Sequence, residues 1–101
     1  MNIHSTAVID STAQIAGDAE IGPYVIIGPH VRIGSRTIVQ AHAVIEGSVT
    51  IGRENFIGPG CVIGAAPQDL SFSPDRQTSV QIGDENVLRE YCTIHRGSAD
   101  G

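Results

Sequence analysis

Aliphatic residues recur at every sixth position through the first two thirds of the chain. The repeat has no gap and contains one valine among isoleucines: Ile3, Ile9, Ile15, Ile21, Ile27, Ile33, Val39, Ile45, Ile51, Ile57 and Ile63. An amphipathic helix repeats every 3.6 residues and a plain strand every two, so neither explains this spacing. A strict six-residue period predicts an all-β fold, a parallel β-helix.

Two positions of each repeat are expected to face the interior. Side chains alternate along a strand, so the aliphatic residue and the residue two before it point the same way. That second residue is small or of modest size, as at Ala13, Ala43 and Cys61. Glycine often follows the aliphatic residue, as at Gly22 and Gly34, and is expected to mark a corner. Three repeats then form one triangular coil, and about five coils stack about 4.8 Å apart.

Outward positions differ between the three sides of the expected prism. One side is polar, with Gln14, Arg32, Thr50 and Gln81. A second is almost entirely apolar, with Val8, Ile26, Val44, Val62 and Thr93, and the remaining side adds Ile38, Phe56 and Val87. An apolar stripe on a surface indicates contact with another subunit, so we expect a homotrimer through the Val8/Ile26/Val44/Val62 side. A dimer also fits the pattern, and the alternative to any interface is ordinary exposed aliphatic surface.

The repeat stops after Ile63 and resumes at Ile82. Their numbers differ by 82 − 63 = 19, so the interruption adds 19 − 6 = 13 positions to the regular spacing. Continuing the old phase would place Asp69 and Asp75 in the interior, and burial of unpaired carboxylates is unfavourable. We therefore expect one extruded loop near residues 65–79, and long loops on compact domains often carry function.

Removing this loop aligns two pairs of inward residues in neighbouring coils. Asn86 falls over Asn55, which predicts a ladder of side-chain amides. Cys92 falls over Cys61, near the distance that a disulfide requires. Small buried cysteines are more often inert apolar residues, and we interpret this pair as structural.

Composition limits the function classes. The 101 residues predict one domain with a net charge of 6 − 11 = −5, which argues against nucleic acid as a partner. No apolar run is long enough to span a membrane, and the N-terminus lacks a signal-peptide pattern. Two cysteines without metal-ligand spacing fit a reducing compartment, so we expect a cytoplasmic protein.

Chemistry-bearing motifs are scarce in the regular repeats. The four histidines form no metal-ligand pattern, and no phosphate loop or nucleophile elbow occurs. We therefore predict no metal, no cofactor and no catalytic residue within the chain. The loop supplies Gln68 and Asp69, an amide and a carboxylate that could bind sugar hydroxyls beside a subunit seam. The alternative is that both are turn residues next to Pro67.

Several motifs resemble the acyl-carrier-protein–UDP-N-acetylglucosamine O-acyltransferase family. Besides the repeats they are Ile27-Gly28-Pro29-His30-Val31, Pro67-Gln68-Asp69-Leu70, Ile82-Gly83-Asp84, Arg89-Glu90 and Thr93-Ile94-His95-Arg96-Gly97. The resemblance covers essentially the whole chain. It implies a left-handed β-helix, an exception to the usual right-handed crossover, in a homotrimer with active sites between neighbouring subunits.

The resemblance also implies a reaction and its site residues. The family transfers a 3-hydroxyacyl chain from acyl carrier protein to the sugar 3-hydroxyl of UDP-N-acetylglucosamine in lipid A biosynthesis. Asp69 resembles the family's sugar-contacting carboxylate, Gln68 its loop neighbour, and His95 a motif histidine that supports the site without being the essential base. Ser71 stands where the family often has lysine.

The family's essential histidine and its C-terminal helices lie beyond the position of Gly101. We therefore expect residues 1–101 to be the N-terminal β-helix domain of a longer acyltransferase and to be inactive alone. The alternative is a catalytically silent hexapeptide-repeat scaffold that trimerises or binds a partner. The residues that would set the acyl-chain length also lie in later coils.

Overall fold

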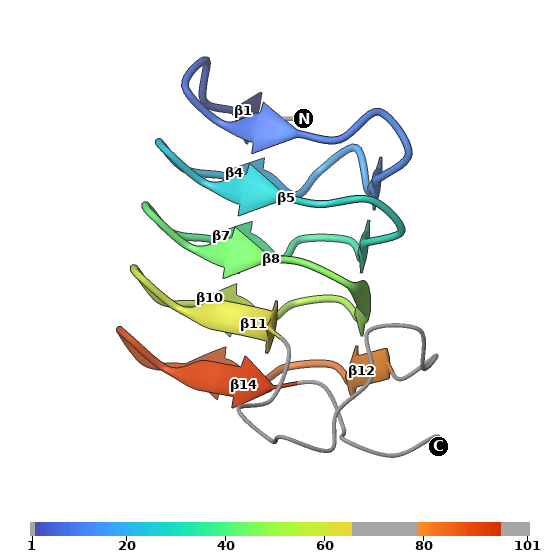
Figure 1. Ribbon diagram of the computed structural model, residues 1–101, viewed down its shortest axis with the longest axis vertical. Helices are drawn as coiled ribbons and strands as arrows, with labels where there is room; N and C mark the ends of the chain where they lie inside the picture. The colour runs from blue at the N-terminus through green and yellow to red at the C-terminus, as the bar shows by residue number, and fades with distance from the viewer. Residues whose placement is uncertain (1, 66–78, 96–101) are drawn as a thin grey trace.

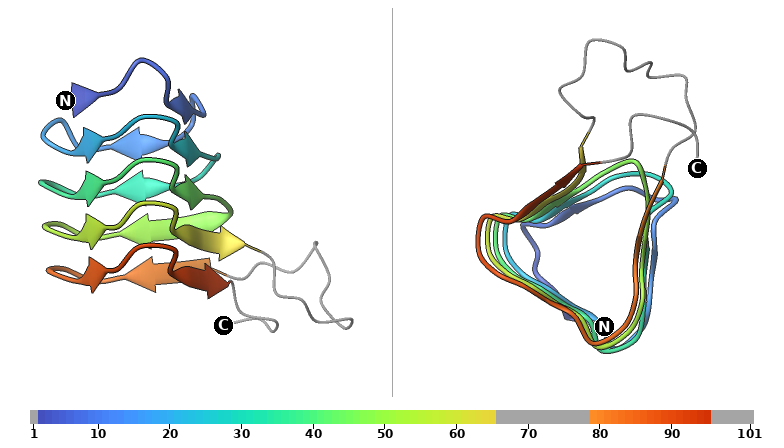
Figure 2. Two further views of the ribbon diagram at one scale, coloured as in Figure 1. Left: turned by 90° about the vertical axis from the view of Figure 1, so that its left-hand side faces the viewer. Right: turned by 90° about the horizontal axis from the view of Figure 1, so that it is seen from below.

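A computed structural model describes residues 2–65 and 79–95, which form three parallel sheets around a triangular core (Figure 1 and Figure 2). Sheet A contains β1 (Asn2–Ile3), β4 (Glu20–Ile21), β7 (Ile38–Val39), β10 (Phe56–Ile57) and β13 (Val87–Leu88). Sheet B contains β2 (Val8–Ile9), β5 (Ile26–Ile27), β8 (Val44–Ile45), β11 (Val62–Ala65) and β14 (Thr93–His95). Sheet C contains β3 (Gln14–Ile15), β6 (Arg32–Ile33), β9 (Ser48–Ile51) and β12 (Ser79–Ile82).

Each pass through sheets A, B and C makes one coil, and equivalent residues stack in register. In sheet B, Ile9 pairs with Ile27, Ile27 with Ile45, and Ile45 with Ile63. The same register continues from Ile63 to Ile94 across the interruption. The six-residue period therefore predicted both the parallel β-helix and the column that each aliphatic residue joins.

The stacked aliphatic residues form the core. Ile27, Ile45, Ile57 and Ile63 are at most 1% exposed, whereas Ile9 in the first coil is only half-buried because no coil precedes it. Full burial of such a side chain is worth roughly 1.5–3 kcal/mol. Stability therefore comes mainly from stacking coil upon coil. Among the described residues no helix is long and apolar enough to cross a membrane.

The corners differ from expectation in where the backbone turns left-handed. Glycines do follow many of the aliphatic residues. The residue with a left-handed backbone, however, is usually the third one after the aliphatic residue, and it is usually not glycine. Within the described ranges the non-glycine cases are Tyr24, His30, Arg36, His42, Glu54, Glu85 and Tyr91. Hydrogen bonds to the preceding coil hold several of them: the His42 N–H, for example, donates to the Pro23 carbonyl at 3.0 Å. These bonds offset the cost of a left-handed L-residue, roughly 1–2 kcal/mol.

Glycine at the first corner position has a steric reason. A Cβ built on Gly34 would lie 2.6 Å from the carbonyl carbon and oxygen of Gly52, the equivalent residue of the next coil. Close approach between coils, rather than backbone conformation, therefore selects glycine here.

Polar residues at the small inward position share one contact. The side chains of Thr37, Asn55 and Cys61 donate to the carbonyls of Gly52, Gly83 and Arg89 at 2.8, 2.7 and 2.9 Å respectively. Each acceptor belongs to the next coil, where it lies three residues before the residue that stacks on the donor. Buried polar groups need such partners, so these bonds let three non-aliphatic residues occupy the core.

The predicted amide ladder is wrong, although the stacking behind it is right. Asn55 Oδ1 accepts from the backbone N–H of Asn86 at 2.8 Å, and Asn55 Nδ2 donates to the backbone carbonyls of Gly83 and Arg53. The Asn55 amide is thus bonded to backbone groups of its own corner and of the next coil, and not to the Asn86 side-chain amide.

The insertion has the predicted length. In sheet C, Ile33 pairs with Ile51, a difference in residue number of 51 − 33 = 18, whereas Ile51 pairs with Ile82, a difference of 82 − 51 = 31. The excess, 31 − 18 = 13, equals the number of additional positions counted from the sequence. Strand β11 ends at Ala65 and β12 begins at Ser79, at the two ends of the loop predicted near residues 65–79. Residues 66–78 of that loop lie outside the described residues.

Candidate functional site

Three strand ends meet at the corner between sheets B and C, in the last two coils. There β11 ends at Ala65, β12 begins at Ser79 and β14 ends at His95 (Figure 2). Ala65 is the register partner of His95. The residue at which the insertion departs therefore lies beside the backbone of the candidate histidine, although the two are far apart in the sequence. We call this corner the insertion corner.

The predicted site residues are described to different extents. His95 lies at the end of β14 in the insertion corner, but its side chain is outside the described set. Gln68 and Asp69 lie outside the described residues altogether. Of the predicted site, the structure thus describes the backbone of His95 and the strand ends on either side of the insertion.

Gly64 sets the direction in which the chain leaves the core. Its φ is +86°, and the register of β11 with β14 shifts between Ile63 and Ala65, as in a β-bulge. A Cβ on Gly64 would overlap the Glu46 carbonyl oxygen and lie 2.6 Å from Val49 Cγ2. Only glycine fits this position. Sequence reasoning did not single it out, because glycine follows many of the repeated aliphatic residues.

The preceding coil turns the same corner without an insertion. Gly47, with a φ of +80°, links β8 to β9. Strand β9 is four residues long and pairs along its full length with β12, from Ser48 with Ser79 to Ile51 with Ile82. This longer ladder fixes the point at which the insertion rejoins the core.

The described part of the insertion corner contains no metal-ligand cluster, and two of the other histidines lie elsewhere. No group of three or more histidine, cysteine, aspartate or glutamate side chains able to hold a metal ion occurs within residues 2–65 and 79–95. Of the other histidines, His4 Nδ1 contacts the Thr6 hydroxyl at 2.8 Å, and the His42 ring stacks on Tyr24 with centroids 5.2 Å apart. Both contacts lie at corners between sheets A and B, so neither histidine faces the insertion corner.

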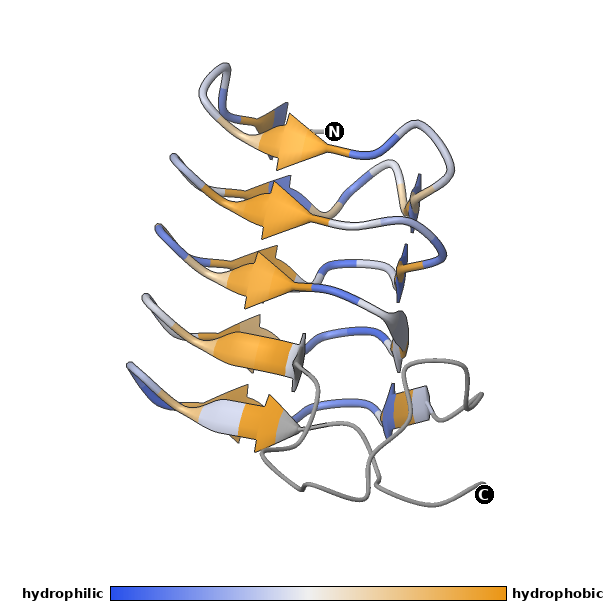
Figure 3. Cartoon of the chain, in the orientation of Figure 1, coloured by the Kyte–Doolittle hydropathy of each residue, from blue (hydrophilic) through white to orange (hydrophobic). Residues whose placement is uncertain are grey.

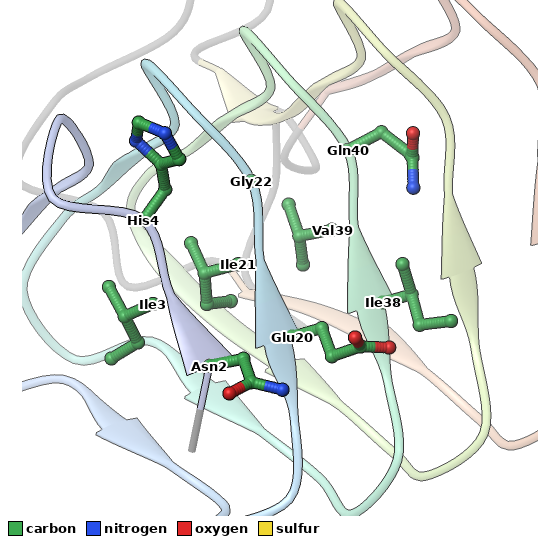
Figure 4. A pocket seen from close by; sticks show the side chains of 9 residues that line it. All are labelled: Asn2, Ile3, His4, Glu20, Ile21, Gly22, Ile38, Val39 and Gln40. Atoms are coloured by element: carbon green, nitrogen blue, oxygen red, sulfur yellow. The ribbon is translucent and has the colours of Figure 1, made fainter.

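A concave region crosses β1, β4 and β7 on sheet A, away from the insertion corner. It is an open groove of about 520 Å³ with Asn2, Glu20 and Ile38 along one side and His4 and Gln40 along the other (Figure 4). The groove lies toward the N-terminal end of the prism, while β12 and β14 lie at the other end (Figure 1). It contains none of the predicted site residues.

Comparisons with known proteins agree on one family. The model of the bacterial transferase hexapeptide family (six repeats) matches residues 1–35 and 30–65. The acyl-[acyl-carrier-protein]–UDP-N-acetylglucosamine O-acyltransferase of Syntrophobacter fumaroxidans is 50% identical over all 101 residues. The chain spans 39% of that relative's length.

Solved structures of this group have the same fold. The UDP-N-acetylglucosamine O-acyltransferase of Moraxella catarrhalis superposes with a TM-score of 0.91 at 48% identity, covering 96% of this chain and 37% of that one. LpxA of Acinetobacter baumannii superposes with a TM-score of 0.90 at 46% identity, covering 94% of this chain and 36% of that one. The expected left-handed parallel β-helix is thereby confirmed. The chain belongs to the bacterial transferase hexapeptide family, and its whole length is similar to part of the acyl-[acyl-carrier-protein]–UDP-N-acetylglucosamine O-acyltransferases.

Proposed function

We propose that residues 1–101 form the N-terminal β-helix of an O-acyltransferase. It moves a 3-hydroxyacyl chain from acyl carrier protein to the 3-hydroxyl of UDP-N-acetylglucosamine, in lipid A biosynthesis in the cytoplasm. The observation that carries this proposal is the 50% identity across the entire chain to a relative named for that transfer. The insertion in the structure supports it, because the inserted segment includes the Gln68-Asp69 motif of the resemblance.

In this proposal the insertion corner is the substrate-binding part of the active site. Asp69 and Gln68 bind sugar hydroxyls, since a carboxylate accepts hydrogen bonds from them and an amide both accepts and donates. His95 supports the site from the end of β14. The pairing of Ala65 with His95 favours this grouping, because it holds the start of the insertion against the strand that carries the histidine.

The reaction needs groups besides the proposed substrate-binding residues. A sugar hydroxyl is a weak nucleophile near neutral pH, so a positioned base must take its proton as the oxygen attacks the thioester carbonyl. The carbonyl oxygen then gains negative charge and needs hydrogen-bond donors. In our proposal the base comes from a later part of a longer protein, and residues 1–101 bind substrate without transferring the acyl group.

We also propose that the chain assembles as a homotrimer. The outward residues of sheet B are apolar except Thr93, and Val8 is 63% exposed. Most of the strand surface of this sheet is coloured as hydrophobic in Figure 3. Sheet A adds a second apolar group near its C-terminal end, formed by Phe56 and Val87. A cyclic trimer needs two different complementary faces on each subunit, because its interfaces are heterologous. Sheets A and B provide two such faces, while the outward residues of sheet C are polar.

A chimera tests the proposed function. Residues 1–101 replace the matching segment of the Syntrophobacter fumaroxidans relative, and transfer from 3-hydroxyacyl carrier protein to UDP-N-acetylglucosamine is measured. We expect the chimera to be active and the 101-residue chain alone to be inactive. In the chimera, Asp69→Ala should raise the KM for the sugar nucleotide at least tenfold, because roughly one hydrogen bond to a charged group is lost. The control variant Asp75→Ala, in the same insertion, should leave this KM unchanged.

Two results would contradict the proposal. A chimera that folds and trimerises without transferring acyl groups would favour a silent scaffold. Thioester consumption by the 101-residue chain alone would show that the base lies within it.

A further inference from the structure

Cys61 and Cys92 are consecutive members of one inward column. They immediately precede β11 and β14, and the pairing of Val62 with Thr93 places them directly next to each other in adjacent coils. Neighbouring strands lie about 4.8 Å apart. Disulfides join residues whose Cα atoms are about 4.4–6.8 Å apart, so this spacing is within the required range. Both thiols are free in the structure.

The Cys61 thiol is directed at the coil that carries Cys92. Its Sγ donates to the Arg89 carbonyl at 2.9 Å. The backbone N–H of Cys92 donates to the same oxygen at 3.3 Å. The Cys61 thiol and the Cys92 backbone N–H therefore share one acceptor, which places the Cys61 sulfur close to the backbone of the Cys92 coil.

The two thiols differ in access. Cys61 is fully buried, whereas Cys92 is half-buried. Burial also raises the pKa of the Cys61 thiol, with a smaller opposing effect from the Cys92 backbone N–H. An oxidant from solution would therefore react first at Cys92, with Cys61 as the resolving thiol.

We propose that Cys61 and Cys92 form a reversible disulfide that fastens the fifth coil to the fourth when the protein meets a small-molecule disulfide such as oxidised glutathione. The Cys92 thiolate attacks one sulfur of the oxidant, releases one glutathione thiolate and forms a mixed disulfide. The Cys61 thiolate then attacks the Cys92 sulfur and releases the second glutathione. Two protein thiols lose two electrons and two protons in total, and the oxidant is reduced to two thiols.

The geometry favours a reversible bond over a permanent one. Side chains stacked on adjacent strands point the same way, so their Cβ atoms start about 4.8 Å apart, while disulfides prefer about 3.8 Å. Closing this gap strains the bond and makes it easier to reduce. Disulfides in reducing compartments are usually transient and redox-sensing. The crosslink would also close the segment that contains the whole insertion, limiting separation of β14 from β11.

Mass spectrometry of the purified chain tests this proposal. The chain is incubated under native conditions with excess oxidised glutathione and then digested with trypsin without reduction. We expect peptide 54–76, which contains Cys61, joined to peptide 90–96, which contains Cys92, with no glutathione retained. Mild reduction with glutathione should separate them again, and the oxidised chain should melt at a higher temperature than the reduced one.

Single-cysteine variants identify the steps. Cys61→Ser should retain one glutathione on Cys92, because no resolving thiol remains. Cys92→Ser should stay unmodified, because Cys61 is inaccessible. The proposal is overturned if the wild-type chain retains glutathione on Cys92 as Cys61→Ser does, if both thiols stay free, or if the only disulfide joins two chains. None of these readouts depends on acyl transfer.

Discussion

Asn55 and Asn86 stack in adjacent coils, and Asn55 Oδ1 accepts a hydrogen bond of 2.8 Å from the Asn86 backbone N–H. The Asn55 amide nitrogen donates to the Gly83 carbonyl at 2.7 Å. These two bonds join the start of the fourth coil to residues that follow the insertion. Thr37 bridges the equivalent groups one coil earlier, where the chain is continuous, so buried side chains of this column join successive coils both before and across the insertion.

Replacement of Asn55 should test that role. Asn55→Ala leaves the Gly83 carbonyl and the Asn86 N–H without their partner, so we expect a loss of about 2–4 kcal/mol in the free energy of unfolding. Asn55→Thr should lose less, because Thr37 already donates to the equivalent carbonyl, that of Gly52, one coil earlier. Urea unfolding of both variants measures the difference. Equal losses would contradict this expectation, because they would mean that a threonine hydroxyl does not take over the bond to the Gly83 carbonyl.

Gly64 should tolerate no side chain. Gly64→Ala introduces a Cβ at a φ of +86° and against the Glu46 carbonyl, so we expect a loss of at least about 2 kcal/mol. Gly17→Ala is the matched control, since a Cβ there meets nothing within 4 Å. It should be neutral or stabilise by up to about 1 kcal/mol. Similar effects from both would mean that the bulge at Gly64 adapts.

The period of the aliphatic residues predicted the register, the three sides and the length of the insertion. Each follows from a single geometric rule: a residue that repeats every six positions joins the same column every third repeat. Column membership needs no knowledge of side-chain contacts. A strict repeat therefore gives long-range pairings, which are usually the hardest part of a fold to predict from one sequence.

Other features depend on local contacts that the period does not encode. The left-handed backbone at Tyr24 and Glu54 runs against the preference of their side chains and is held by groups in the neighbouring coil. In the sequence, Gly64 follows an aliphatic residue as many other glycines of the repeat do, so its special conformation has no sequence signal. Gln68 and Asp69 lie within the insertion, where the six-residue period ends. Their proposed roles therefore rest on the resemblance of a short motif to a known family, and not on the period.

Self-association should depend on sheet B. Val44→Lys together with Val62→Lys places two charges in the apolar column, and burying them in an interface is unfavourable. We expect the variant to lose the higher mass of the wild-type chain in sedimentation velocity. Thr50→Lys with Gln81→Lys adds the same charge to the polar outward column of sheet C and should leave the mass unchanged. An unchanged mass for the sheet B variant would place the interface elsewhere.

Acid stability should depend on Asp18. The Ser35 hydroxyl donates to its carboxylate at 2.7–2.8 Å and the Arg36 N–H at 3.0 Å. The Ser35 bond first, and then the Arg36 bond, hold the pKa of this carboxyl below its ordinary value of 3.8. A lowered pKa in the folded state means that the ionised form stabilises the fold. The contribution is therefore present above pH 3.8 and is lost as the pH falls through the folded-state pKa.

Asp18→Asn should consequently be less stable than the wild type near neutral pH, and the two should converge in acid. Ser35→Ala should show a similar convergence with a smaller difference, because the Arg36 N–H still binds the carboxylate. Thermal melts between about pH 2 and pH 7 measure both curves. A constant gap between Asp18→Asn and the wild type across this range would mean that Asp18 stabilises the corner through shape alone, since only an ionisable group can make the difference depend on pH.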